Sequence, residues 1–260
     1  MPLSVRLFIL SVFLCGSCSP TPNDIPDDGP DAGGVSSVDS GASSDEDNDA
    51  GGPTTPVPLP GFGTVSGACG VLASEVPSPS PSFFVNTLDF GTDPYDDVDE
   101  ARLTDGGREI LADGNAGGSS LLSEVFAYEV LARCEGATLL KTELEVEYTD
   151  PQGKITDLLV ELAGERVGVS VTRAVTFPRD QPYALSDAQE LLEKKLSGIL
   201  SSSANVAADD AWQKQILSVI AYAPAHAAVL EEALQGIDTS LQRDTIVYVT
   251  VSEGDDEFLY

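Results

Sequence analysis

Four cysteines are the side chains with the most definite chemistry in this sequence of 260 residues. Cys15 and Cys18 have the spacing of a redox pair, but that chemistry needs a strand followed by a helix, and these two end an apolar leader. Cys69 and Cys134 remain as a pair in the rest of the chain. In an oxidising compartment such a pair is a disulfide candidate. The alternative is two small, buried apolar side chains.

Other reactive residues have surroundings that do not favour catalysis. His226, the sole histidine, falls at the start of an expected helix, where a surface or capping position suits it. Ser170 lies inside a β-rich run and lacks the second glycine of a nucleophile elbow. The aspartates of residues 93–99 could approach a cation, but they lack the glycine and final glutamate of a calcium loop. A solvated loop is therefore the favoured interpretation of that segment.

The chain opens like a signal peptide. Arg6 precedes an apolar run over residues 7–14. This run is far shorter than the roughly 20 residues that a membrane-spanning helix needs. Small residues follow at Gly16 and Ser17, as they do at a cleavage site. The sequence therefore predicts export and no transmembrane anchor.

Residues 14–18, with the sequence LCGSC, resemble a bacterial lipobox, in which small residues precede the cysteine that is acylated. The usual aliphatic residue three places before that cysteine is Cys15 here, with Leu14 one place earlier. The resemblance implies a lipoprotein precursor that is tethered in the bacterial cell envelope through a lipid on Cys18. Ser19 is not the residue associated with retention in the inner membrane, which favours the outer membrane.

Residues 19–60 predict a disordered, acidic linker. They are mainly Pro, Asp, Gly, Ser, Ala and Thr, with almost no large apolar side chain. Such a segment cannot bury enough surface to offset its ordering entropy, so we expect it to hold the folded part off the membrane.

Acidic residues also dominate the remaining chain. The first sixty residues hold nine of the 43 acidic and one of the 13 basic residues, so the rest carries a net charge near −22. Nucleic acids and anionic membrane surfaces are disfavoured as partners, because a polyanion is repelled unless metal ions or a local basic pocket intervene.

Before residue 119 the pattern is irregular. Residues 61–118 are rich in Gly and Asp, with short apolar pieces. Within them, 82–90 predicts a strand and 101–111 a tight hairpin around Thr-Asp-Gly-Gly.

Residues 119–260 predict a regular α/β core. Apolar residues all round the axis indicate a buried first helix, so Glu124 and Glu129 lie among apolar neighbours. Short turns predict an antiparallel meander of three strands, and crossover helices make the later strands parallel. The expected elements are a helix at 119–134, strands at 138–148, 155–162 and 166–175, a helix from a capping box at Ser186 and Gln189, a strand at 215–222, a helix at 225–235 closed by Gly236, and a strand at 245–251.

This order resembles the core of the PD-(D/E)xK nuclease-like superfamily over residues 119–251. In that family an acid of the first helix, an aspartate at the second strand and a Glu-x-Lys on the third gather around a divalent cation. Glu124 and Asp157 match the first two positions, whereas Ser170 and Thr172 replace the glutamate and the lysine. The resemblance implies a restriction-endonuclease-like fold with a degenerate motif, in which Glu124 and Asp157 bind metal only if the site is active.

A lysine from another element could repair the motif. Lys195 falls inside the apolar stripe of its helix, while Lys194 lies outside it. Lys195 is therefore a candidate for a migrated catalytic lysine, and the alternative is that its ammonium extends to the edge of the stripe. Arg173 lies on the strand face opposite Ser170, where it would pair with Glu124 or Glu129 or bind an anion.

Three functions stay open from the sequence. The first is a lipid-anchored exported protein whose nuclease-like domain is non-catalytic, needs no cofactor and acts as a binding or structural module. The second is a nuclease or phosphodiesterase that uses Mg²⁺ or Mn²⁺ with Glu124, Asp157 and Lys195. The third is a surface protein whose acidic face binds cations or a basic partner. The sequence names neither a ligand nor a protein partner.

Overall fold

The computed structural model describes residues 57–58, 63–179 and 181–260. The signal peptide, Cys18 and all of the linker except Val57 and Pro58 lie outside the described residues. In the part of the chain that the structure describes, no helix is both long and apolar enough to span a membrane.

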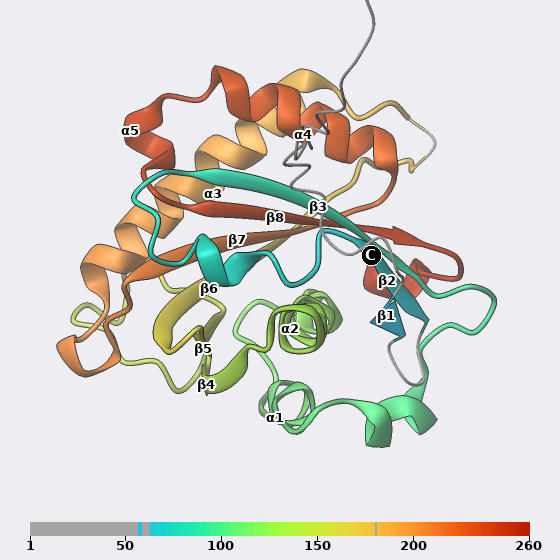
Figure 1. The fold of residues 1–260 in the computed structure, drawn as a ribbon, viewed down its shortest axis with the longest axis horizontal. Helices are drawn as coiled ribbons and strands as arrows, with labels where there is room; N and C mark the ends of the chain where they lie inside the picture. The colour runs from blue at the N-terminus through green and yellow to red at the C-terminus, as the bar shows by residue number, and fades with distance from the viewer. Residues whose placement is uncertain (1–56, 59–62, 180) are drawn as a thin grey trace, which may run out of the picture. The chain divides into compact units, whose positions relative to one another are not determined.

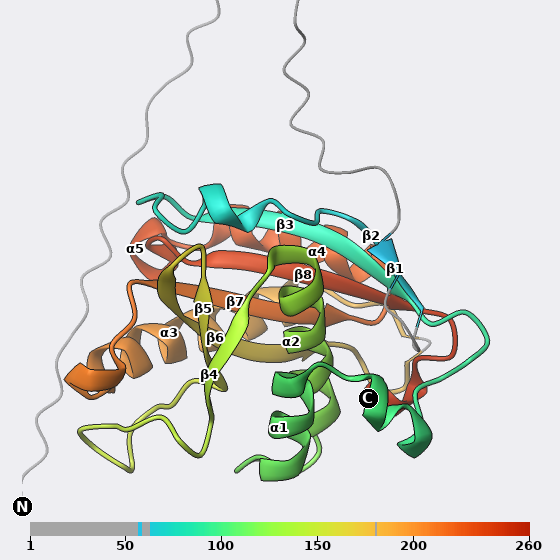
Figure 2. The same ribbon diagram turned by 60° about the horizontal axis from the view of Figure 1, so that its bottom comes forward.

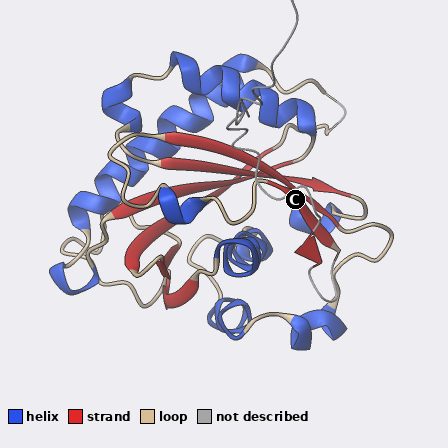
Figure 3. Ribbon diagram, in the orientation of Figure 1, coloured by secondary structure: helices blue, strands red, loops and turns tan. Residues whose placement is uncertain are grey.

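The described residues form an eight-stranded mixed sheet in the order β1-β2-β3-β8-β7-β6-β5-β4. Helix α2 lies on one face of the sheet and helices α3 and α4 lie on the other (Figures 1 and 3). The strands are β1 (Val57–Pro58), β2 (Thr64–Gly67), β3 (Ser82–Asp89), β4 (Thr138–Thr142), β5 (Leu158–Leu162), β6 (Glu165–Ala174), β7 (Lys214–Ala221) and β8 (Ile246–Glu253). The helices are α1 (Asp105–Asp113), α2 (Leu121–Glu135), α3 (Leu185–Asn205), α4 (Pro224–Gly236) and α5 (Thr239–Gln242), with short 3-10 helices η1 (Leu72–Ser74), η2 (Asp97–Arg102), η3 (Ala208–Asp210) and η4 (Glu257–Leu259).

The expected α/β order of the core is confirmed. After α2, strands β4, β5 and β6 form an antiparallel meander. Helix α3 then crosses to β7, which pairs parallel with β6, and α4 leads to β8, which pairs parallel with β7. The chain is therefore a mixed α/β protein.

Helices cover both faces of the central strands, which explains why these strands are mainly apolar. Strand β7 is buried along its whole length, as expected for a parallel strand between two helical layers. One apolar layer packs α2 against the sheet around Phe126 and Tyr248, and the other packs α3 and α4 around Leu192 and Leu230. Helix α2 ends at Gly136, whose φ of 72° suits a glycine cap.

The part of the chain before residue 119 joins the same sheet. Strand β3, predicted at 82–90, pairs parallel with β8 over its whole length, and β2 pairs antiparallel with β3. These early strands extend the core sheet on the side of β8.

The hairpin predicted at 101–111 is wrong, because this segment is helical. Thr104 caps α1 by accepting a hydrogen bond from the amide of Gly107 at 3.1 Å. Helix α1 lies beside α2 (Figure 2). A Cβ at Gly106 or Gly107 would collide with Tyr128 or Glu129 of that helix. The glycines therefore permit close helix packing, which turn chemistry alone does not reveal.

Three boundaries also differ from expectation. Strand β4 ends at Thr142 and β5 begins only at Leu158, so both are shorter than the β-rich runs. The capping box at Ser186 is absent, because α3 begins at Leu185 with Ala184 as its cap and without a side-chain hydrogen bond. Because β5 begins late, the neighbouring strand β6 continues beyond the residues that pair with β5.

Candidate functional site

The candidate site lies where β6 extends beyond its partner β5. The pairing of these strands ends with Leu158 opposite Val169. Beyond that point, the carboxylate of Asp157 accepts a hydrogen bond from the amide of Val171 at 2.7 Å and another from the Ser170 hydroxyl at 3.1 Å. Side chains therefore supply hydrogen bonds to β6 where the backbone pairing with β5 ends.

Lys195 completes this arrangement from helix α3. Its ammonium donates to the carbonyl of Val171 at 2.6 Å. The structure thus brings Lys195 to the site, as the migrated-lysine hypothesis requires, but the ammonium is bonded to the protein backbone. Thr172, at the position of the family's lysine, is half-buried and neutral.

Glu124 is buried in α2 and has its own hydrogen-bond partners. Its carboxylate accepts from the Asn115 amide at 2.7 Å and from the Ser120 hydroxyl at 2.9 Å. Burial raises the pKa of Glu124 to about 7, and the negative charge of Asp157 adds to the rise. Glu124 and Asp157 are therefore close enough to interact electrostatically.

Glu143 joins Glu124, Asp157 and Lys195 in one charge cluster, although its sequence position does not indicate this role. This half-buried glutamate accepts a hydrogen bond from the amide of Ala116 at 2.8 Å. Burial raises its pKa, Asp157 raises it further and Lys195 lowers it. In the sequence, Glu143 falls inside the strand expected at 138–148, and nothing there singles it out. The feature that marks Glu143 is its position in the structure, directly after Thr142, the last residue of β4 that pairs with β5.

The carboxylates of this cluster do not fit the divalent cation that the family resemblance implies. One carboxylate oxygen of Asp157 already accepts hydrogen bonds from Val171 and Ser170. The carboxylate of Glu124 accepts hydrogen bonds from Asn115 and Ser120. Within the described ranges, no three His, Cys, Asp or Glu side chains are grouped so that they could hold a metal ion. Desolvation raises the pKa of Asp157, whereas Lys195 and the hydrogen bonds to its carboxylate lower it.

A cavity of about 320 Å³ opens beside Asp157. Its walls come from the turn before β5, from β6 and from α3. The residues that line it are Gly153, Lys154, Ile155, Asp157, Ser170, Lys194, Lys195 and Gly198.

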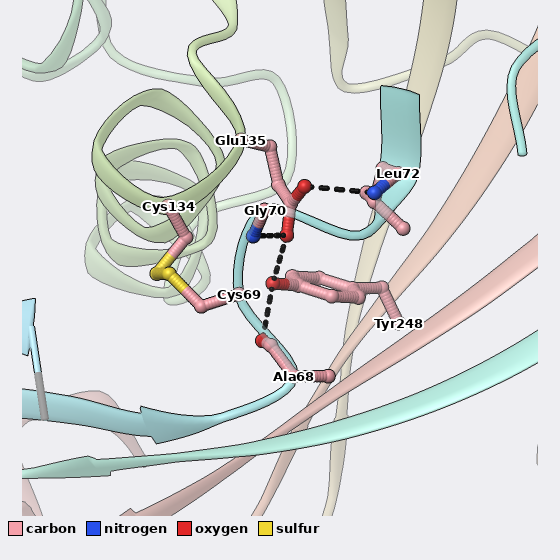
Figure 4. Close-up of a disulfide and its surroundings, with 7 residues drawn as sticks. All are labelled: Ala68, Cys69, Gly70, Leu72, Cys134, Glu135 and Tyr248. Carbon is pink, nitrogen blue, oxygen red and sulfur yellow. Dashed lines mark hydrogen bonds between the residues drawn. A yellow bond between two sulfur atoms is a disulfide. The ribbon is translucent and has the colours of Figure 1, made fainter. Parts of the chain in front are cut away.

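Cys69 and Cys134 form a disulfide that joins the segment after β2 to the end of α2 (Figure 4). Their Cα atoms lie 4.8 Å apart. The next residue, Glu135, accepts hydrogen bonds from the amides of Gly70 at 3.0 Å and Leu72 at 2.8 Å. The same segment is therefore held to α2 both covalently and through a carboxylate.

The hydroxyl of Tyr248 extends this contact to the centre of the sheet. Its single proton is shared between two acceptors, the carboxylate of Glu135 at 2.8 Å and the carbonyl of Ala68 at 3.0 Å (Figure 4). This group of contacts stabilises the fold and lies apart from the cavity beside Asp157.

Other residues considered from the sequence have structural roles. His226 lies at the start of α4, but it is buried, and its Nδ1 lies 2.8 Å from the carbonyl oxygen of Ala174. The expected surface position is wrong, because the first turn of α4 packs onto the end of β6. In the acidic loop, Asp96 caps η2 and Asp99 pairs with Arg102 at 3.1 Å.

Arg173 pairs with neither Glu124 nor Glu129, the two partners expected from the sequence. It donates to the carbonyls of Leu259 at 3.0 Å and Ser119 at 3.4 Å. Glu129 is instead paired with Arg133, one turn along its own helix, at 2.6 Å. Arg173 therefore connects the end of β6 to the last described residues of the chain.

Comparisons with known proteins do not assign the chain to a family. No family model matches it. The chain is 38% identical over 164 residues to the AAC-rich mRNA clone AAC4 protein of Dictyostelium discoideum, a match that covers 61% of this chain and 24% of that protein. The chain thus spans about a quarter of the length of this relative. Among solved structures, SfsA of Pyrococcus furiosus in complex with Ca²⁺ is similar with a TM-score of 0.25 and 15% identity, over 52% of this chain and 57% of that one.

Proposed function

We propose that this chain is an exported, lipid-anchored protein whose nuclease-like domain is non-catalytic and acts as a binding module. The observation that carries the proposal is the pair of hydrogen bonds by which Asp157 and Lys195 satisfy the amide and the carbonyl of Val171. If either side chain turned to a substrate, a buried backbone group would lose its partner, at a cost of about 1–3 kcal/mol.

The neutral residues at the strand positions support the same proposal. Ser170 and Thr172 stand where the resembling nucleases place an acid and a lysine. Charge stabilisation of the transition state is often the largest catalytic contribution, and one lost donor lowers the rate roughly 10²- to 10³-fold. The charge cluster thus lacks the groups that phosphodiester cleavage needs at this strand.

Export and lipidation rest on the N-terminal sequence and gain support from the disulfide. A bond between Cys69 and Cys134 suits an oxidising compartment outside the cytoplasm. We propose that the lipid on Cys18 tethers the protein in the bacterial cell envelope, in the outer membrane, with residues 19–60 as the linker.

A nuclease assay tests the non-catalytic role. The purified mature protein, in detergent, is mixed with DNA or with a chromogenic phosphodiester at physiological salt, while Mg²⁺ or Mn²⁺ is titrated. We expect neither DNA binding nor metal-dependent cleavage.

The opposite result would establish the phosphodiesterase function in its place. In that case, cleavage should be abolished by Asp157→Ala and lowered by Lys195→Ala. It should be unchanged by Arg102→Gln, which removes an exposed charge on η2. Glu143→Gln would then show whether this glutamate supplies the third acid.

A further inference from the structure

The cavity beside Asp157 concentrates positive charge in a very acidic protein. We name it the lysine pocket, because Lys154, Lys194 and Lys195 line it. These are three of the five lysines in a chain whose net charge is −30. Asp157 is the one acidic residue among the lining residues, and its charge is opposed by Lys195.

The lysines of the pocket keep hydrogen-bond donors for a ligand. Among the described residues, no ion pair involves Lys154 or Lys194. Lys195 donates to the Val171 carbonyl. An ammonium has three N–H donors, so two of those on Lys195 remain for another partner.

Gly198 gives an independent indication that the pocket must stay open. It lies inside α3, where glycine is destabilising relative to alanine. A Cβ added at Gly198 would meet no atom within 4 Å, so the packing of the protein does not require glycine there. Residues 194 and 198 are four apart and share one helix face. The missing side chain therefore leaves space in the pocket, which Lys194 also lines.

We infer that the lysine pocket binds a small oxyanion with at least two negative charges, either a phosphate monoester or a polycarboxylate. This inference rests on the proposed binding function and specifies its ligand. A volume of about 320 Å³ is at the small end of ligand pockets, which span roughly 300–1,000 Å³. The acidic surface repels a long polyanion, whereas a small one lies wholly within reach of the lysines.

Calorimetric titration of the mature protein tests the inference. Inorganic phosphate, pyrophosphate and citrate are titrated separately at low salt, so that the phosphate and carboxylate arms are distinguished. We expect saturable binding of at least one of them that weakens as sodium chloride is added. Lys154→Gln and Lys194→Gln should each weaken binding about tenfold, and Arg102→Gln should not change it.

A variant that fills the cavity separates shape from charge. Gly198→Leu should abolish binding with every charge still present, and circular dichroism checks that it is folded. If it is not, the exposed Lys154 and Lys194 variants still decide the question. The absence of saturable binding for all three anions overturns the inference, as does equal binding by Lys154→Gln and Arg102→Gln. Metal-dependent cleavage would overturn the proposed function and is scored separately, by product formation.

Discussion

Asp157 and Lys195 hold the two polar backbone groups of a single residue. The carboxylate accepts from the Val171 amide at 2.7 Å, and the ammonium donates to the Val171 carbonyl at 2.6 Å. Both groups of a strand residue point to the same side, so the two side chains continue the ladder that β5 leaves unfinished. A carboxylate and a lysine that resemble catalytic groups thus serve here as a substitute for a strand.

Removing either member of this pair should destabilise the fold. We expect Asp157→Ala and Lys195→Met each to lower the free energy of unfolding by about 2–4 kcal/mol, because each leaves a backbone group of Val171 without a partner and removes a favourable charge from the other side chain. The double variant should lose less than the sum, since the electrostatic interaction between the two side chains is then lost only once.

Urea denaturation of the two single variants and the double variant measures this coupling. Lys194→Met, on an exposed side chain of the same helix, should change the free energy of unfolding by less than about 0.5 kcal/mol. Strictly additive losses would show that Asp157 and Lys195 do not act together.

Glu124 should make stability depend on pH. Its pKa rises from the usual 4.5 to about 7 in the folded protein. The folded state therefore binds this proton more tightly than the unfolded chain. The resulting stability is fully present below the unfolded pKa and is lost as the pH rises through about 7.

The isosteric variant Glu124→Gln removes this dependence. Its free energy of unfolding, relative to the wild type, should rise between about pH 5 and about pH 8. Glu193→Gln, on the exposed side of α3, serves as the control and should show no such trend. A relative stability of Glu124→Gln that falls with pH would refute the assignment.

The disulfide should contribute strongly to stability. It joins residues separated by 65 positions, and the chain-entropy model assigns a loop of this length about 4 kcal/mol. We expect the double variant Cys69→Ser, Cys134→Ser to lose a free energy of unfolding of that size in urea. Thiol counting on the denatured, unreduced protein should find neither cysteine free, and two free thiols would disprove the bond.

Lipidation should depend on one cysteine. Cells that express the full precursor with a radioactive fatty acid should label the wild type, and Cys18→Ala should remove the label. Cys15→Ala is the matched control, because it alters the leader and keeps the acceptor. Equal labelling of wild type and Cys18→Ala would place the lipid elsewhere.

Elements with strong periodicity could be predicted from the sequence. The buried helix around Phe126, the meander and the crossover helices follow from apolar patterns and turn lengths, which are local properties. The prediction of a hairpin around Gly106 and Gly107 is wrong because it rests on the same local patterns. Its glycines are needed because a Cβ there would collide with Tyr128 or Glu129 of another helix, and no local pattern reveals that contact.

For the candidate site too, the sequence indicates some features and tertiary packing sets the others. Residue types and spacing were enough to single out Glu124, Asp157 and Lys195 and to show that Ser170 and Thr172 carry no charge. Which groups these side chains contact depends on where β5 stops beside β6, and strand ends are set by pairing between segments distant in sequence. Tertiary packing therefore decided that Asp157 and Lys195 bind backbone, that a glutamate after β4 joins them, and that three lysines surround one cavity.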